Sequence, residues 1–258
     1  MLVPLSAHGA FVVNNKGTYF TGDLGVVIDR ETYLNGGYER ESIDLFLASV
    51  RPDRRGVILD VGCNAGTHSL QFAKVFSVVH AFDPNPALWE QFEANAALNG
   101  AKHITLHRLG LGREEASLPL YAIDSNNHGL GTFSNSPQYD KPLIQIGEAR
   151  VANGADYIHS LGIDRVDAIK IDVQGFEGEV LQGFNPILAR DRPLVWVEAG
   201  GDAAGAIRTL EQMQAFFPYK ISVVQMGGYR RLLSYASRLA PAAQSLQSGD
   251  YLVSHAGP

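Results

Sequence analysis

Residues 57–85 read VILDVGCNAGTHSLQFAKVFSVVHAFDPN, and this stretch decides the fold. Its opening apolar run, 57–61, is typical of a strand that is buried on both faces of a parallel sheet. A turn containing glycines follows at once, and the spacing of apolar residues after Thr67 predicts a helix. A second apolar run, 78–82, ends on Asp83. Strand, turn, helix, strand and acidic residue together predict one βαβ unit.

The turn after the first strand suits a ligand that carries a nucleoside. Glycine permits a tight turn and a close approach to the backbone, and the helix start offers free N–H groups. Asp83 lies about 20 residues past the turn, the spacing at which an acidic residue accepts hydrogen bonds from ribose hydroxyls. A tight turn with no ligand is the alternative, but the turn and Asp83 together favour a nucleoside site.

The glycine spacing discriminates between nucleoside ligands. A turn that binds dinucleotides has the pattern G-x-G-x-x-G, whereas this chain has Gly62 and Gly66 with Asn64 in place of the middle glycine. The spacing therefore argues against a pyrophosphate lying on this turn. The form D-V-G-x-N-x-G, which starts at Asp60, is typical of S-adenosylmethionine-dependent methyltransferases of the Rossmann-like class.

The bulk composition is that of a soluble globular protein, because 45% of the 258 residues are hydrophobic and 19% are charged. The chain is long enough for a sizeable core, and we interpret residues 1–258 as a single domain. The net charge of −6 gives no support to a nucleic-acid partner, because phosphates require a basic face.

Cysteine usage and hydropathy bear on the compartment. Cys63 is the only cysteine, which excludes an intramolecular disulfide and fits a reducing environment. The N-terminus lacks the basic segment and apolar run of a secretory signal, and no stretch has the roughly 18 uninterrupted apolar residues of a membrane span. We therefore expect a cytoplasmic protein with no membrane partner.

The segment before the βαβ unit, 1–50, has too few apolar residues for a core of its own. Its turn-prone residues between two short apolar runs predict a hairpin over 10–20. We expect a further strand at 26–29 and a helix that begins near Tyr38 and ends at Arg51. The segment is interpreted as an N-terminal cap on the cofactor end of the sheet.

The rest of the chain alternates between strand-like and helix-like patterns, as in a sheet with helices on both faces. The expected strands are 104–109, 117–123, 148–152, 166–172, 194–197, 220–225 and 250–254. The expected helices are 86–98, 155–161, 177–181 and 205–217, with 231–249 as a helical insertion.

Residues 124–142 differ from their surroundings, since they are polar, rich in glycine and asparagine, and without periodicity. Loops of this length in compact domains are often lids or binding loops. We favour a lid over a plain surface loop and expect His128 to bind the substrate.

Four blocks resemble the FkbM family of methyltransferases: VILDVGCNAGTHSLQFA, AFDPNP, IKIDVQGFEGEVLQG and VWVEAG. The third block is the most specific. It keeps the family residues Lys170, Asp172, Gly175, Glu177, Glu179 and Gly183. It departs at Gln174, where the family usually has glutamate. The resemblance covers roughly residues 35–200, and the blocks together are specific to the family.

The resemblance implies a Rossmann-like α/β fold with a seven-stranded, mostly parallel sheet whose last strand is antiparallel. It also implies S-adenosyl-L-methionine as methyl donor and a hydroxyl oxygen of a sugar or secondary metabolite as acceptor. In this reading Asp83 holds the ribose and Asp172 lies beside the methionine part. The expected cofactor-binding residues are Asp60, Gly62, Cys63, Asn64, Gly66, Thr67, Asp83, Pro84, Asn85, Gly110 and Asp172.

A sugar hydroxyl is a poor nucleophile, so a general base should assist transfer. Asp172 and Glu198 end strands at the edge where α/β sheets bind ligands, and we expect both to face the acceptor, one of them as the base. Glu177, one helical turn further, is expected to bind the substrate. Alternatives are that Asp172 holds the cofactor's ammonium group, that Glu198 only ends its strand, and that Glu177 only favours its helix dipole.

Two smaller sets of expectations complete the site. His68 is either a ligand contact or a hydrogen-bonded packing residue, and no metal site is expected because no dense Asp/Glu/His cluster occurs. We expect acceptor selectivity in 1–50, 124–142 and 231–249. The competing functions are an NAD-type oxidoreductase on the same βαβ unit and a binding module without catalysis.

Overall fold

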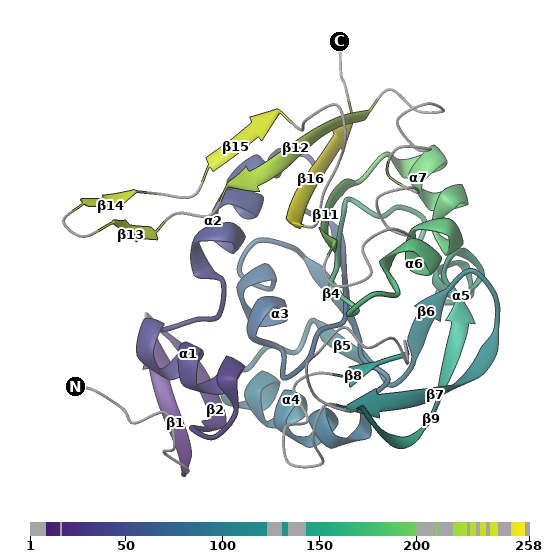
Figure 1. The fold of residues 1–258 in the computed structure, drawn as a ribbon. Helices are drawn as coiled ribbons and strands as arrows, with labels where there is room; N and C mark the ends of the chain where they lie inside the picture. The colour runs from purple at the N-terminus through teal and green to yellow at the C-terminus, as the bar shows by residue number, and fades with distance from the viewer. Residues whose placement is uncertain are drawn as a thin grey trace.

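A mixed sheet runs through the centre of the molecule in the computed structural model (Figure 1). The residues described are 9–15, 17–122, 131–133, 143–199 and 210, and the strand residues 219–225, 228–230, 233–235, 238–241 and 249–255.

The central sheet has eight strands in the order β15-β12-β16-β11-β10-β3-β4-β5. Their bounds are Arg238–Pro241 (β15), Tyr219–Gln225 (β12), Gly249–His255 (β16), Leu194–Ala199 (β11), Ala168–Ile171 (β10), Val57–Val61 (β3), Val78–Phe82 (β4) and Ile104–His107 (β5). The strands from β11 to β5 are parallel. At the other edge, β15 runs antiparallel to β12, β12 to β16, and β16 to β11. This arrangement confirms the expected α/β Rossmann-like fold.

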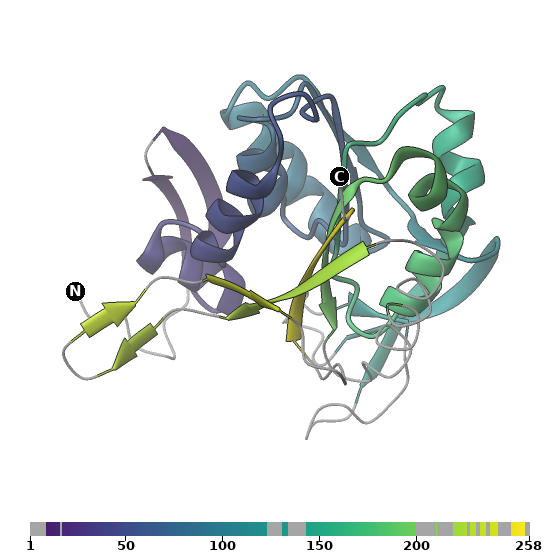
Figure 2. The ribbon, with the colours of Figure 1, turned by 90° about the horizontal axis from the view of Figure 1, so that it is seen from above.

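Alternate residues of the parallel strands enter two different cores. On β3, Leu59 and Val61 join one apolar cluster, whereas Ile58 joins the other. The first cluster includes residues of helices α5 (Gly154–Ser160), α6 (Glu177–Gly183) and α7 (Asn185–Asp191), and the second includes residues of α2 (Arg40–Ser49) and α3 (Thr67–Phe72). Figure 2 shows these two sets of helices on opposite sides of the sheet. Both faces are therefore buried, as the continuous apolar runs predict.

The βαβ unit is confirmed as β3, α3 and β4. Helix α4 (Pro86–Leu98) follows, and Asn85 caps it by accepting a hydrogen bond from the backbone N–H of Ala87. Helix α7 was not predicted. It follows α6 without a connecting loop and has Pro186 in its first turn.

The N-terminal segment contains the expected hairpin, β1 (Ala10–Asn15) paired with β2 (Thr18–Asp23), and the expected helix α2. The strand predicted at 26–29 is wrong, because helix α1 (Val27–Asn35) begins there. Three consecutive apolar residues fit either element. The buried carboxylate of Asp29 decides for the helix, since it accepts hydrogen bonds from the backbone of Asp23 and the side chain of Gln91.

A second sheet of four strands lies beside the first, in the order β6-β9-β7-β8. Its strands are β6 (Gly110–Gly112), β9 (Ile144–Asn153), β7 (Ala116–Ala122) and β8 (Gly131–Thr132). The predicted strands 117–123 and 148–152 are confirmed in it. Their separate sheet was not foreseen, because strand pairing is set by tertiary contacts.

The C-terminal region confirms the closing pair, β12 with β16, and corrects one prediction. The helical insertion predicted at 231–249 is wrong, because the described residues of this range lie in strands. Strand β14 (Leu233–Tyr235) pairs with β13 (Gly228–Arg230), and β15 pairs with β12 as an eighth strand beyond the seven expected. The open edge of β12 presents unpaired backbone groups that β15 satisfies. The helix expected at 205–217 lies outside the described residues, except for Leu210, which is helical and buried.

No helix in the described ranges combines the length and apolar character needed to cross a membrane.

Candidate active site at the carboxyl ends of the strands

A pocket of about 270 Å³ opens at the carboxyl ends of β3, β4 and β10. Besides residues that follow these strands, its wall includes Val26–Ile28 and Tyr38 from the N-terminal segment and Leu111, Leu120 and Gly131–Phe133 from the second sheet. Open α/β sheets bind ligands beyond the carboxyl ends of their strands, so this pocket is the candidate site.

The glycine turn forms one wall of the pocket in a fixed conformation. Gly62 has φ +80°, and a Cβ there would lie 1.8 Å from the carbonyl oxygen of Asp172. Asn64, with φ +51°, adopts the left-handed conformation, and its backbone N–H donates to Oδ2 of Asp83 over 2.9 Å. The turn and the acidic residue at the end of β4 are thus joined directly.

Asp83 presents a buried carboxylate to the pocket. Its Oδ1 accepts a hydrogen bond of 2.9 Å from the backbone N–H of Asn85, and its side chain is 6% exposed. Burial raises the pKa of Asp83 to about 6, against the hydrogen bonds from Asn85 and Asn64, which lower it. Each oxygen retains a lone pair with which to accept a ligand hydroxyl.

Apolar side chains of the second sheet form the next part of the wall. A Cβ on Gly110 would lie 2.9 Å from the ring of Phe133, which makes an edge contact with Phe176 at 5.2 Å. The hydroxyl of Thr132 donates to the carbonyl oxygen of Gln174 over 2.8 Å. Residues 131–133 belong to the expected lid, and the structure places this part of it at the pocket.

The third part of the wall is charged. The ammonium of Lys170, 3% exposed, donates to the carbonyl oxygen of Gly62 (3.0 Å) and to Oδ2 of Asp172 (3.2 Å), and lies 3.7 Å from Oδ1 of Asp60. Burial favours the neutral lysine, but Asp172 and Asp60 outweigh it and raise the pKa of Lys170. Burial likewise favours the neutral Asp172, but Lys170 lowers the pKa of that carboxyl overall. Lys170 and Asp172 therefore form an ion pair at the pocket.

Residues 60–230 match the family model described as the methyltransferase FkbM domain. The chain belongs to the FkbM methyltransferase family. This match confirms the resemblance of the four sequence blocks and removes the basis for an NAD-type oxidoreductase.

Individual relatives of known sequence are distant. Methyltransferase 1 of Beauveria bassiana is 30% identical over 146 residues, which are 50% of this chain and 58% of the relative. Hexuronic acid methyltransferase AglP of Haloferax volcanii is 26% identical over 175 residues, which are 67% of this chain and 68% of the relative. The chain thus spans little more than half of the first relative's length.

The crystal structure of Methyltransferase FkbM from Methylobacillus flagellatus KT has a TM-score of 0.50 to this chain at 16% identity. The alignment covers 78% of this chain and 44% of that protein. At this identity the likeness supports the Rossmann-like fold and nothing finer.

Most of the cofactor residues expected from the FkbM resemblance line the pocket together. They are Gly62, Cys63, Asn64, Thr67, Asp83, Pro84, Asn85, Gly110 and Asp172. Asp60 and Gly66 lie outside the pocket wall as described. Asp60 is fully buried and accepts a hydrogen bond from Ser69, and Gly66 packs against Phe92 at the start of α3. Asp60 and Gly66 lie at the two ends of the glycine turn and hold it through these contacts.

The residues expected to face the substrate are placed differently. Glu177 lies outside the described pocket wall. It is 1% exposed, and its carboxylate accepts hydrogen bonds from the backbone N–H groups of Gly175 (2.9 Å) and Val173 (3.3 Å). Burial raises its pKa to about 7. Glu198 is also outside that wall, half-buried on β11 opposite Asp250 of β16. His128 lies outside the described residues.

Several residues of this FkbM pocket were not predicted. In the sequence Lys170 stands out only as a residue that the FkbM block keeps, with no role predicted for it. Its position two residues before Asp172 places both on one face of the strand, a signal that would have revealed the pair. Tyr38 and Val26–Ile28 carry no such signal, because only the fold brings them to the pocket.

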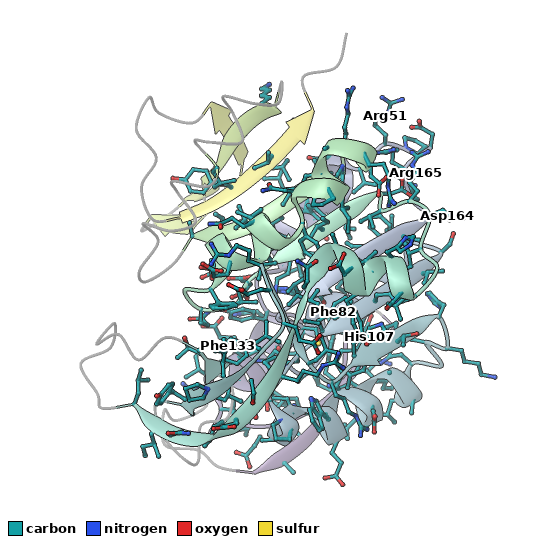
Figure 3. All side chains as sticks on the ribbon, turned by 90° about the vertical axis from the view of Figure 1, so that its right-hand side faces the viewer. Arg51, Phe82, His107, Phe133, Asp164 and Arg165 are labelled. Carbon is teal, nitrogen blue, oxygen red and sulfur yellow. The ribbon has the colours of Figure 1, made fainter. Side chains whose placement is uncertain are left out.

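A second, more open cavity of about 580 Å³ lies at the amino ends of β3 and β10. Its charged residues pair with each other: Arg51 with Asp53, Arg165 with Asp167, and Arg190 with Asp191. Figure 3 shows Arg51, Arg165 and Asp164 well away from Phe133, which marks the first pocket. Because these charges are largely satisfied within the protein, the first pocket remains the candidate site.

Proposed function

We propose that the chain is an S-adenosylmethionine-dependent methyltransferase that acts on a hydroxyl oxygen of a sugar or secondary metabolite. The observation that carries the proposal is that one pocket joins three chemically different parts. These are an apolar part around Phe133, the carboxylate of Asp83, and the ion pair of Lys170 and Asp172.

Each part matches one portion of the cofactor. The apolar part suits the adenine ring, and the Asp83 carboxylate has free lone pairs for the ribose hydroxyls. Lys170 and Asp172 offer opposite charges to the carboxylate and ammonium groups of the methionine portion. When bound, the cofactor supplies a methyl group that its sulfonium already activates. The chain's own contribution is to bind, orient and exclude water.

The acceptor class rests on the family resemblance and on one relative. AglP, by its name, methylates a hexuronic acid, which is a sugar derivative. A small hydroxylated molecule also fits a concave pocket at the sheet edge better than a nucleic acid fits a chain of net charge −6.

The test is calorimetric titration of the purified protein with S-adenosylhomocysteine, with NAD titrated in parallel. We expect micromolar binding of the first and no heat from the second, followed by methyl transfer in a panel of hydroxylated sugars and metabolites. Binding of NAD alone would overturn the proposal. Cofactor binding without transfer to any acceptor would favour a module that binds but does not catalyse.

A further inference from the structure

Two neighbouring residues of the N-terminal segment, Tyr38 and Glu39, contact His68 of α3. Tyr38 and His68 both line the pocket, whereas Glu39 lies outside the described pocket wall, with its Oε2 3.6 Å from Nε2 of His68. The rings of Tyr38 and His68 stack with centroids 5.9 Å apart. A hydrogen bond joins the side chains of Tyr38 and Glu39. Residues far apart in sequence thus form one polar group.

His68 is held rigidly in this group. Its ring lies within stacking distance of both Tyr38 and Trp196, the latter at 5.7 Å, and it forms a hydrogen bond with the backbone of Tyr38. Burial, together with the charge of Lys170, lowers the pKa of His68 to about 3, so the imidazole is neutral. Nε2 has no hydrogen-bond partner among the described residues although the side chain is only 5% exposed. A buried acceptor nitrogen without a hydrogen-bond donor costs free energy, so a proton donor beside this atom would stabilise it.

Glu39 supplies that donor when it carries a proton. It stands at the start of α2 with φ +49°, a left-handed conformation that is strained for a residue other than glycine. In the described structure its carboxylate does not cap the helix and faces His68 instead. The side chain is 17% exposed, so it is largely shielded from water but not enclosed.

The two carboxylates expected as bases are less suited to that task. The charge of Asp172 is neutralised by Lys170, which lowers its pKa and makes it a weak base. The charge of Asp172, and then burial, raise the pKa of Glu198 to about 9, so Glu198 already holds a proton at neutral pH. Burial raises the pKa of Glu39 to about 7, which matches the optimum for a general base at neutral pH.

We propose that Glu39 is the general base of this site and that His68 is its positioning residue. The inference rests on the proposed methyltransferase function and adds the residue that takes the acceptor's proton. As the acceptor's O–H bond breaks, the proton passes to a carboxylate oxygen of Glu39. The oxygen's electron pair forms the new O–C bond, and the electron pair of the breaking S–C bond stays on sulfur. Protonated Glu39 then donates to Nε2 of His68, which stabilises the proton there.

The charged groups around Glu39 come from every element packed against it. They are Lys170 and Asp172 at β10, Glu198 on β11, Asp250 on β16, and Tyr38 and His68 beside it. Asp172 and Asp250 add to the effect of burial on its pKa, and Lys170 opposes them. Below about pH 7 Glu39 is protonated and cannot accept a proton, so methyl transfer should rise with pH through this range.

The first test needs neither cofactor nor acceptor. Nitrogen NMR of histidine-labelled protein should show His68 Nε2 unprotonated at neutral pH and responding to a titration near pH 7, when Glu39 loses its proton. Glu39→Gln should abolish that step, whereas Glu41→Gln, an exposed control on the same helix, should retain it. A protonated His68, or no response of Nε2 between pH 5 and 9, would overturn the pairing.

The second test uses the acceptor found in the sugar and metabolite panel. Glu39→Gln should lower kcat by about 100-fold or more and remove the rise in rate near pH 7, while S-adenosylhomocysteine binds within threefold of wild type. Glu39→Asp, which keeps the charge, should lose less. His68→Phe keeps a stacking ring but removes the acceptor of protonated Glu39. The pKa of Glu39 should therefore fall, and the rise in rate with pH should begin at a lower pH.

The two tests separate the proposals. If Glu39→Gln keeps wild-type kcat and pH profile, the base assignment is wrong even though methyl transfer stands. If no panel member is methylated, the acceptor class is wrong, while the NMR result still decides the Glu39–His68 pairing.

Discussion

Asp83 links the turn, the next helix and the pocket through its carboxylate and its backbone oxygen. Its oxygens accept the backbone N–H groups of Asn64 and Asn85, and its backbone oxygen accepts the indole N–H of Trp89 over 2.9 Å. The carboxylate thus fixes two loops and lines the pocket. Replacing it removes the contacts that shape the pocket wall.

Asp83→Ala should raise the Kd for S-adenosylhomocysteine by about 100-fold or more, because hydrogen bonds to a charged group contribute about 1.5–3 kcal/mol each. Since the pKa of Asp83 is about 6, wild-type affinity should also fall as the pH drops from 7 to 5 and the carboxyl takes up a proton. Calorimetry at both pH values measures this. Unchanged affinity in the variant would remove Asp83 from the site.

Gly62 is required by both its backbone conformation and its surroundings. Gly62→Ala should destabilise the protein by more than Gly100→Ala, measured by urea unfolding. Gly100 also has a positive φ, +60°, but a Cβ there meets nothing within 4 Å, so only backbone strain of about 1–2 kcal/mol applies. At Gly62 the clash with the Asp172 carbonyl adds to the strain. Equal losses in the two variants would contradict the steric argument.

At the scale of elements, β10 carries a buried charge network. Lys170 lies on the strand between Asp60 of β3 and Asp172, and all three are tied to the glycine turn through the carbonyl oxygen of Gly62. The strand therefore supports the glycine turn and also contributes to the pocket. Breaking such a network leaves uncompensated charges in the interior.

Lys170→Met should lower the free energy of unfolding by about 3–5 kcal/mol at pH 7, because Asp60 and Asp172 lose their cation. The loss should shrink at pH 5, where the carboxyls take up protons more readily. Lys74→Met, at an exposed lysine on the segment after α3, is the control and should change stability by less than about 0.5 kcal/mol. A loss below about 1 kcal/mol in the first variant would argue against the network.

Local pattern predicted the elements that depend on local signals. The strands β3, β4 and β11, the capped helix α4 and the closing pair β12–β16 follow from apolar runs, turn residues and proline. The start of α1, the strand β15 and the pairing of the second sheet depend on distant partners, such as Gln91 for Asp29. For the same reason the glycine turn was predictable, whereas Tyr38 is brought to the pocket, and Glu39 to His68, only by the fold.

At the scale of the whole molecule, the N-terminal segment is linked to the glycine turn through side chains of α4. Asn95 of α4 accepts the backbone N–H of Thr21 on β2 (2.7 Å) and donates to the carbonyl oxygen of Ala65 (2.8 Å). Asn99 makes two further hydrogen bonds to the backbone of Tyr19. The hairpin and the pocket therefore share one rigid connection through α4.

Binding of S-adenosylhomocysteine should slow amide hydrogen exchange in β2 as well as in the turn. If the ligand restricts the motion of Ala65, the hydrogen bonds of Asn95 pass that restriction on to Thr21 of β2. Asn95→Ala should reduce the protection of β2 by more than that of the turn, while the hydrogen bonds of Asn99 to Tyr19 remain. Hydrogen–deuterium exchange with mass spectrometry resolves the two segments. Protection of β2 that survives the substitution would mean that the coupling runs through other contacts.

The order of strands at the antiparallel edge has a consequence for biosynthesis. Strand β16 lies between β11 and β12, although it follows both in the chain. During synthesis on the ribosome, one edge of β11 stays unpaired until residues 249–255 emerge. Before then β12 and β15 cannot join the sheet, because β12 pairs with β16. Asp250 arrives with the same strand, so the acidic surroundings of Glu39 are completed only at this late stage. A nascent chain thus gains its glycine turn early and the strand that carries Asp250 last, which delays the complete pocket region until the sheet has closed.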